Sequence, residues 1–382
     1  MSAPEKTVVV TGIAGNLGVR LLREIPEFDV FGLDMNPVLD PTVPDRASFH
    51  SVTIDLGEEP SSHELIELLR KSEAQSVVHL AFVIDPLRTG VLDVDRMWRI
   101  NVAGTARVME AVAVVNRTGG VVKKFVYVSS VAAYGADLPG PVSEDHPLAG
   151  HTLPYAVHKR EADQVAQVRA AAMGTCSTYI LRPHIFAGAS MRNYLINILR
   201  NTPYGQGWLG RRMEARGRKL PALIPYGRKY LNTRFQYVHV DDMARLLAWI
   251  LRRPDVGRNL TILNVAGRGD ALTFERCAQI AGTKVTRVPG KAACRMVLEL
   301  GWKLGISSVP ASAVPYFTGT YLMDTKRLRE FLGKDYEDVI RHTCEEALAD
   351  SFKPSSDFRG TADRTAPGQV PRVGRNTTAW PS

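Results

Sequence analysis

The sequence predicts an α/β protein built on a doubly wound parallel sheet, with a smaller C-terminal substrate-binding region. Two observations carry this prediction. Short β-branched runs alternate with longer segments of helical spacing, which is typical of βαβ units whose strands are buried on both faces. A glycine-spaced turn follows the first run, and it lies at the end of a strand, where such sheets bind ligands.

The expected elements follow one another along the first half of the chain and return after an interruption. Strands are expected at Thr7–Thr11, Val30–Asp34, Ser51–Ile54, Ser76–Leu80, Lys124–Ser129 and Ser177–Arg182. Helices are expected between them at Ser61–Lys71, Val91–Asn116 and Pro154–Met173. After a Gly-, Pro- and Arg-rich stretch, a strand and helix are expected within Phe235–Leu251 and a strand at Thr261–Asn264.

The turn Thr11–Gly18 predicts a dinucleotide site. Its glycines recur at Gly12, Gly15 and Gly18, directly after a strand and at the opening of a helix, and Asn16 and Leu17 within the turn are also expected to bind the cofactor. Glycine is needed in such a turn because the backbone must bend tightly, approach a pyrophosphate and let the helix pack on the sheet. The amino end of the helix then offers free N–H groups to the phosphates.

The second expected strand ends in Asp34, where a carboxylate can accept hydrogen bonds from both hydroxyls of an adenosine ribose. No arginine stands in the following Met35-Asn36-Pro37 to meet a 2′-phosphate. We therefore expect NAD rather than NADP. The alternative is an aspartate that only caps its own turn.

Composition divides the chain into five parts. We expect a Rossmann-type dinucleotide-binding domain at 1–188, a basic insertion of the substrate region at 189–234, and a return to the first domain at 235–270. A substrate-binding cap is expected at 271–352, because that segment is apolar but broken by Pro and Gly. The tail at 353–382 is rich in Pro, Ser, Thr, Gly and Arg and is expected to be disordered.

The net charge of +9 comes largely from one stretch. The cations of this stretch are Arg211, Arg212, Arg216, Arg218, Lys219, Arg228, Lys229 and Arg234, opposed only by Glu214. They form either a solvated surface loop or a cradle for a phosphate-bearing substrate. Nucleic acid is not expected as a partner, because few aromatic residues interleave with these charges and no nucleic-acid-binding motif accompanies them.

Several other classes of protein are disfavoured. The polar start, Ser2-Ala3-Pro4-Glu5-Lys6, does not resemble a secretory signal, and no segment approaches the roughly 18 apolar residues of a membrane span. The four cysteines lie far apart without ligand spacing, so neither a metal site nor a disulfide framework is expected. A reducing cytoplasm is the expected location, and the expected partner is a small-molecule substrate.

A set of motifs in a fixed order gives the chain a family resemblance. The motifs are the TGxxGxxG turn, Asp55-Leu56, His79-Leu80-Ala81, Asn101-Val102-Ala103-Gly104-Thr105, Ser129-Ser130 with Tyr134-Gly135, Tyr155 to Lys159, Leu181-Arg182-Pro183 and Val238 to Asp242. In these motifs the chain resembles the extended short-chain dehydrogenase/reductases, a group that includes nucleotide-sugar epimerases and dehydratases and 3β-hydroxysteroid dehydrogenases. The resemblance covers roughly residues 7 to 350.

The resemblance implies positions for the cofactor. Asp55 and Leu56 are expected against its adenine, and Leu80 and Ala81 along its length. Asn101 is expected near the nicotinamide half, as are Thr105, Pro183 and His184. For His184 the alternative is a core histidine whose ring is satisfied by backbone, which we favour over an acid–base role. Asp241 and Asp242 are expected to cap the following helix.

Tyr155 and Lys159 stand four residues apart in a segment of helical spacing, so their side chains leave one face of a helix. A tyrosine with a pKa near 10 is a poor proton-transfer group at neutral pH. An ammonium group and an oxidised nicotinamide beside it favour the phenolate and lower that pKa. The resemblance adds Ser130 as a hydrogen-bond donor to the reacting oxygen and gives Lys159 a second role on the nicotinamide ribose.

The chain departs from the family pattern in its substrate region. Val131 and Ala132 stand where sugar dehydratases carry acidic residues, so elimination of water is disfavoured. Ile185 and Phe235 replace an asparagine and an arginine that hold a substrate diphosphate, although Arg234 is adjacent. Phe82, Val83 and Ile84 are expected to add to an apolar pocket wall. An alcohol or ketone substrate with an apolar body is therefore expected.

Three functions stay open from the sequence. The first is a dehydrogenase or reductase that exchanges NAD at each turnover, and the second is a nucleotide-sugar epimerase that keeps NAD bound. The third is a non-catalytic NAD-binding regulator, which the intact Ser130, Tyr155 and Lys159 make the least favoured. A homodimer is expected through the helices at Val91–Asn116 and Pro154–Met173, as in members of the family.

Overall fold

The computed structural model describes residues 6–38, 48–84, 93–254 and 259–353. Of the sequence-based expectations, the tail from residue 354 on, the first residues of the helix expected at Val91–Asn116 and the polar start fall outside the described residues. Among the described helices, none is both long enough and apolar enough to cross a bilayer.

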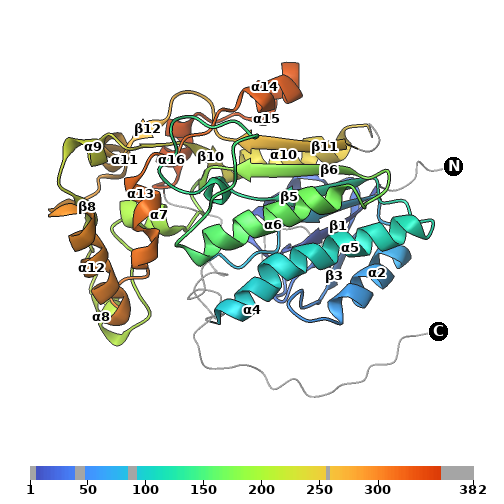
Figure 1. The fold of residues 1–382 in the computed structure, drawn as a ribbon, viewed down its shortest axis with the longest axis horizontal. Helices are drawn as coiled ribbons and strands as arrows, with labels where there is room; N and C mark the ends of the chain where they lie inside the picture. The colour runs from blue at the N-terminus through green and yellow to red at the C-terminus, as the bar shows by residue number, and fades with distance from the viewer. Residues whose placement is uncertain (1–5, 39–47, 85–92, 255–258, 354–382) are drawn as a thin grey trace.

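A seven-stranded parallel sheet forms the centre of the protein (Figure 1). Its strands are β1 (Lys6–Thr11), β2 (Phe28–Leu33), β3 (Phe49–Val52), β4 (Ser76–His79), β5 (Lys124–Val128), β6 (Ser177–Pro183) and β11 (Asn259–Val265). Their order is β11-β6-β5-β4-β1-β2-β3, so the chain starts inside the sheet and winds outward in both directions. The doubly wound α/β class predicted from the sequence is confirmed.

Helices cover both faces of this sheet, because the inner strands are apolar on both sides. α1 (Asn16–Glu24) and α10 (Val240–Arg252) pack on one face, together with α14 (Lys326–Leu332) and α15 (Tyr336–Val339). α2 (Ser61–Lys71), α5 (Gly104–Arg117) and α6 (Pro154–Ala170) cover the other face (Figure 1). A three-layer arrangement results, with an apolar cluster on each side of the sheet.

Some element boundaries differ from the sequence prediction. The third strand lies at Phe49–Val52 rather than Ser51–Ile54, since an edge strand with half-exposed residues has a weak apolar signature. α6 ends at Ala170 rather than Met173. The helix expected up to Asn116 is divided into α4 (Val94–Trp98), a π-helical turn η1 (Arg99–Ala103) and α5.

The remaining elements gather at one end of the molecule, on the left of Figure 1. They include the following helices and strands: β7 (Ile185–Ala187), α7 (Tyr194–Leu199), α8 (Trp208–Ala215), β8 (Ala222–Pro225), α9 (Arg228–Leu231), β9 (Arg234–Phe235), β10 (Tyr237–His239), β12 (Leu272–Thr273), α11 (Phe274–Ala281), β13 (Val285–Val288), α12 (Gly290–Lys303), η3 (Ala311–Ala313), α13 (Val314–Thr318) and α16 (Cys344–Asp350). β8 pairs with β13 in parallel. The two stretches on either side of α10 therefore share one apolar core.

Candidate active site

The turn after β1 brings backbone, rather than side chains, to the end of the sheet. Gly12 has a φ of +74°, and a Cβ there would lie 2.6 Å from the amide nitrogen of Ala81. A Cβ on Gly18 would lie 2.5 Å from the carbonyl oxygen of Ile13. Gly15 is the N-cap of α1. A side-chain-free turn that leads directly into a helix N-terminus fits the diphosphate of a dinucleotide.

Asn16 and Leu17, the first two residues of α1, connect this turn to neighbouring parts of the protein. Asn16 donates from Nδ2 to Oγ of Ser190 at 3.0 Å, and Leu17 packs against the apolar core around β1. Asn16 thus joins the glycine turn to the segment that follows β7.

Asp34 lies directly beside the glycine turn. Its Oδ2 accepts a hydrogen bond from the amide of Ala14 at 3.0 Å, and its Oδ1 accepts one from the amide of Asn36 at 3.0 Å. The carboxylate therefore caps its own turn, and the same two bonds fix it next to the turn that would hold the cofactor.

The other residues expected along the cofactor border the same edge. Leu80 and Ala81 follow β4, and their amides donate to the carbonyl oxygen and Oγ1 of Thr11 at 3.0 and 3.2 Å. Asp55 accepts from the amide of Gly57 at 2.9 Å and pairs with Arg96 at 3.1 Å. Leu56 is buried.

Asn101 anchors the segment that follows β4. It accepts a hydrogen bond from the amide of Val83 at 2.6 Å and donates to the carbonyl oxygen of Val83 at 3.0 Å. Its backbone carbonyl accepts from Thr105 Oγ1 at 2.7 Å, and Thr105 Oγ1 also lies 3.0 Å from Nε2 of His79. Asn101 stands in the π-helical turn η1, whose extra residue separates α4 from α5.

Ser130, Tyr155 and Lys159 meet at the end of β5. Ser130 caps the short helix η2 (Val131–Tyr134), and its Oγ accepts from the amide of Ala132 at 3.1 Å. Tyr155 and Lys159 both lie on α6, which begins at Pro154. Lys159 Nζ donates to the carbonyl oxygen of Val128 at 2.7 Å. A helix start and a strand end thus bring the predicted catalytic residues to one edge.

Phe82 covers this group. Its ring centroid lies 3.5 Å from Lys159 Nζ, and its ring meets that of Tyr155 edge to face at 5.8 Å. Tyr155 also packs against the apolar cluster that contains Ala132, as does Ile185. The expected apolar wall therefore includes Phe82, whereas Ile84 is 45% exposed.

Burial sets the proton affinities of the site. It raises the pKa of Tyr155 to about 12, and a hydrogen bond with Ser130 opposes this rise. It lowers the pKa of Lys159 to about 7, opposed by the charge of Asp163. The chain by itself therefore holds the phenol protonated at neutral pH, and a cation beside Tyr155 is needed to favour the phenolate.

Asp163 is a site residue that the sequence reasoning missed. It stands four residues after Lys159 on α6 and is fully buried. Its carboxylate binds Arg182 of β6 through two hydrogen bonds of 2.8 and 2.9 Å, and accepts from Ser129 Oγ at 2.6 Å. The signal was present in the sequence, since Tyr155, Lys159 and Asp163 repeat at a helical spacing of four.

Arg182 extends this network. Its Nη1 donates to Tyr134 Oη and to the carbonyl oxygen of Glu144, each at 2.7 Å. Tyr134 in turn donates to Asn264 of β11 at 2.7 Å. The buried cation therefore connects α6, β6, η2 and β11 next to the predicted catalytic residues.

Pro183 ends β6, and His184 follows it as a buried residue. His184 Nε2 bonds the carbonyl oxygen of Tyr321, and Nδ1 accepts from the amide of Ile185 at 2.9 Å. Burial lowers the pKa of His184 to about 4. Of the two roles considered, the structure favours the neutral histidine with backbone partners.

The expectation that Asp241 and Asp242 cap α10 was wrong. His239 is the N-cap, and its Nδ1 accepts from the amide of Asp241 at 3.2 Å. Asp241 instead pairs with Arg20 at 2.5 Å. Asp242 is fully buried and binds the amide and ring of His342 at 3.0 and 2.8 Å. Both carboxylates lie in the first turn of α10, but they bind residues far away in the sequence instead of the amides at the helix end.

The ring nitrogens of His239 and His342 and a carboxylate oxygen of Asp242 lie within 4.8 Å of one another, and atoms of these kinds can bind a metal ion. Each of them also has protein partners. His239 lies 3.1 Å from Asp350 through Nε2, and Arg245 bonds Asp242. The ligand atoms are therefore already bonded within the protein, to Asp350, to the guanidinium of Arg245 and to one another.

The basic residues between Arg211 and Arg234 lie in two different places in the structure. Arg211, Arg212, Arg216, Arg218 and Lys219 are exposed on α8 and the residues after it. Lys229 and Arg234 instead line a cavity of about 350 Å³, together with Lys291 and Asp137.

The segment at 318–322 forms one wall of this cavity. Thr320 and Leu322 line the cavity, whereas Tyr321 between them is buried and packs edge-on against His184 at 5.1 Å. The cavity is therefore separated from His184 by this segment.

A family model matches residues 8–266, and its description is NAD dependent epimerase/dehydratase family. The chain is 30% identical over 162 residues to D-erythronate dehydrogenase of Cupriavidus necator, which is 40% of this chain and 47% of that protein. It is 37% identical over 82 residues to UDP-glucose 4-epimerase of Erwinia amylovora, which is 22% of this chain and 23% of that protein. The chain thus matches less than half of either curated relative.

Solved structures are similar over most of the chain. MoeE5 in complex with UDP-glucuronic acid and NAD superposes with a TM-score of 0.59 at 23% identity, over 91% of this chain and 97% of that one. The dTDP-glucose 4,6-dehydratase of Bacillus anthracis in complex with NAD gives 0.63 at 17%, over 91% and 96%. UDP-glucose 4-epimerase of Thermotoga maritima with UDP-glucose gives 0.61 at 16%, over 91% and 98%. At these identities the similarity concerns the fold.

Proposed function

The chain belongs to the NAD dependent epimerase/dehydratase family, and from that premise we propose that it is an NAD-dependent oxidoreductase of a secondary alcohol or ketone with an apolar body. One observation carries the proposal. Ser130, Tyr155 and Lys159 converge at the end of β5 beneath an apolar wall formed by Phe82, and Tyr155 packs against the apolar cluster that contains Ala132. This wall suits a carbon skeleton better than a diphosphate, whose charges would lose their partners there.

The chain's own residues divide the work of binding. The turn at Gly12 to Gly18 holds the diphosphate, and Asp34 holds the adenosine ribose. Lys159, fixed on Val128 at 2.7 Å, holds the nicotinamide ribose. The charge of Asp163 only partly opposes the burial that lowers the pKa of Lys159 to about 7. Bound at these residues, NAD in its oxidised form would supply a hydride acceptor and a positive charge to the site.

Tyr155 and Ser130 handle the proton. Ser130 donates a hydrogen bond to the substrate oxygen and fixes it beside Tyr155. Tyr155 takes the hydroxyl proton as the alcohol is oxidised and returns it in the reverse direction. Because burial raises the pKa of Tyr155 to about 12, its phenol stays protonated at neutral pH until a cation lies next to it.

The proposal is tested by a screen for cofactor reduction. Apolar secondary alcohols and nucleotide sugars are offered in parallel, with NAD and NADP in separate arms, and the Tyr155→Phe variant serves as the inactive control. We expect reduction of NAD by members of the alcohol panel. Turnover confined to nucleotide sugars would contradict the apolar substrate.

The second candidate is a nucleotide-sugar epimerase that retains NAD. The cavity lined by Lys229, Arg234 and Lys291 supports it, since these cations could pair with a diphosphate. An epimerase would be purified with tightly held NAD and would show no net reduction. Exchange of NAD with solvent at each turnover would exclude this candidate.

The preference for NAD depends on Asp34. A carboxylate fixed by the amides of Ala14 and Asn36 repels the 2′-phosphate of NADP. Replacing Asp34 by Ser removes that charge, so the ratio of NAD to NADP affinity should fall by roughly tenfold or more. Dissociation constants from titration of both cofactors measure this ratio, and an unchanged ratio would refute the role of Asp34.

The homodimer is also part of the proposal. α5 and α6 lie side by side on the same face of the sheet, and Val168 on α6 is 77% exposed. A second copy packed on these helices would bury that face. Light scattering should give the mass of two chains, and a single-chain mass at micromolar concentration would contradict it.

A further inference from the structure

Two helices of the C-terminal region expose large apolar side chains. On α8 these are Trp208 and Leu209, which are 65% and 39% exposed. On α12 and the residue after it they are Met296, Val297, Leu300 and Leu304, which are 67%, 41%, 58% and 55% exposed. We call these six residues and the helices that carry them the α8–α12 face. Exposed apolar groups concentrated in this way mark an interaction surface.

The exposed residues of α12 form a stripe. Met296, Leu300 and Leu304 follow one another at intervals of four, and Val297 lies beside them. The opposite side of the helix buries Cys294 and Leu298 in the core of the C-terminal region. Folding therefore uses only one side of α12, and its outer stripe has no role in that core.

The two helices are held in contact by their backbones. The amide of Gly207 donates to the carbonyl oxygen of Gly305 at 3.0 Å. A Cβ on Gly205 or Gly210 would lie 2.5 Å from the same oxygen, so the chains approach as closely as glycine allows. The start of α8, which carries Trp208, is thereby fixed against the end of α12, which carries Leu304. The apolar residues of both helices belong to one surface.

Cations surround the apolar residues. From α8 onward Arg211, Arg212, Arg216, Arg218 and Lys219 are exposed, with Glu214 as the acidic residue among them. Arg212 stacks on the ring of Trp208 at 5.0 Å. α12 adds the exposed Arg295 and Lys303, and Lys303 pairs with Glu299 at 3.1 Å. The face is therefore both apolar and strongly basic.

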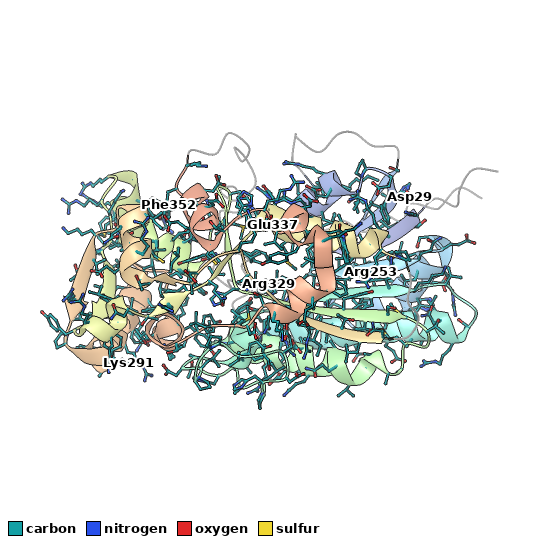
Figure 2. The ribbon with its side chains drawn as sticks, turned by 90° about the horizontal axis from the view of Figure 1, so that it is seen from above. Asp29, Arg253, Lys291, Arg329, Glu337 and Phe352 are labelled. Atoms are coloured by element: carbon teal, nitrogen blue, oxygen red, sulfur yellow. The ribbon has the colours of Figure 1, made fainter. Side chains whose placement is uncertain are left out.

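This face lies at the end of the molecule away from the main sheet. In Figure 1, α8 and α12 form the lower left end, whereas α5 and α6 lie on the right. Figure 2 places Lys291, at the start of α12, at the opposite end from Asp29 and Arg253 beside the main sheet. A flat surface can therefore approach the α8–α12 face without covering α5 and α6.

We propose that the α8–α12 face docks the protein on the surface of a lipid bilayer that contains anionic lipids. Tryptophan, leucine and methionine side chains enter the boundary between headgroups and acyl chains, while arginines bind the lipid phosphates. A second copy of the chain is a poor occupant, because self-docking would bring two arginine-rich rims together. Nucleic acid leaves the apolar stripe without a partner.

The test is flotation of the full chain with vesicles of phosphatidylcholine alone and of phosphatidylcholine with phosphatidylglycerol. We expect binding to the anionic vesicles, at least about tenfold weaker binding to the neutral ones, and loss of binding as salt is raised. The double variant Met296→Ser/Leu300→Ser and the double variant Arg211→Gln/Arg212→Gln should each weaken binding by roughly tenfold or more. The first removes apolar contact and the second removes charge.

The matched control is Val121→Ser in the segment between α5 and β5, which removes a 47% exposed apolar side chain from outside the α8–α12 face and should leave vesicle binding unchanged. Unchanged melting temperatures and NAD titration show that the variants fold. Equal binding to both vesicles, no binding to either, or binding that survives both double variants overturns the proposal. So does a chain mass in light scattering that falls only in the α12 variant, which would assign the face to a second copy.

Discussion

The charged side chains of the α6–β6 contact are buried and paired, whereas those of the α8–α12 face are exposed to solvent. Arg182 and Asp163 are 1% and 0% exposed, and each charge is met by several hydrogen bonds. Arg211 and Arg212 on α8 are exposed to solvent. Paired, buried charges hold a fixed geometry, whereas exposed charges remain available for a partner. The first region is therefore suited to position catalytic groups, and the second to meet another surface.

The largest expected effect is that of Tyr155→Phe, which removes the hydroxyl of the proposed proton-transfer group and keeps its ring. We expect kcat to fall roughly 100- to 10,000-fold, with the NAD dissociation constant nearly unchanged. Steady-state rates and cofactor titration check this outcome. Full activity in the variant would show that the hydroxyl of Tyr155 on α6 is not needed for the reaction. The α6–β6 contact would then have no catalytic tyrosine to position.

The next effect concerns stability. In Asp163→Asn the charge of Arg182 stays buried without its carboxylate partner, so the free energy of unfolding should fall by about 3–5 kcal/mol. The control is Glu110→Gln, which removes an exposed carboxylate paired with Arg117 and Arg169 and should cost about 0–1 kcal/mol. Urea unfolding measures both. Equal losses would show that burial does not separate the two kinds of ion pair.

A third prediction uses pH. Burial lowers the pKa of Lys159 from its ordinary value of 10.5 to about 7, so between these values the unfolded chain binds a proton that the folded chain does not. Stability contributed by this group therefore rises with pH across that window. Relative to Lys159→Met, the wild type should gain stability as pH increases from 7 toward 10, as measured by urea unfolding at each pH. A constant difference between the two proteins would contradict the burial of the ammonium.

The smallest effect is expected on the α8–α12 face. Leu300→Ser changes a side chain that is 58% exposed, so the free energy of unfolding should shift by less than about 0.5 kcal/mol. Leu298→Ser, its neighbour on the buried side of α12, should lose about 2 kcal/mol or more. Thermal unfolding of both variants sharpens the comparison on a single helix. A large loss from Leu300→Ser would mean that the outer stripe serves folding.

Sequence reasoning found the features that depend on neighbours along the chain. The turn at Gly12 to Gly18 and the pair Tyr155 and Lys159 were placed correctly on their elements, and the strand expected at Val30–Asp34 lies at Phe28–Leu33. It missed Asp163, because the helical spacing from Lys159 places this carboxylate on the same face of α6 but does not show that its partner is Arg182 on a strand. It also assigned the cap of α10 to Asp241 and Asp242, whose long-range partners are Arg20 and His342.

By itself, the sequence determined the doubly wound class, the glycine turn and the helix that carries Tyr155 and Lys159, because strand and helix periods and glycine spacing are local properties of a chain. Only the tertiary structure decided which charges are buried and paired, that His184 is held by backbone, and that α12 leaves an apolar side uncovered. These depend on contacts between segments far apart in sequence. Burial and the proton affinities that follow from it come from packing, which no local pattern records.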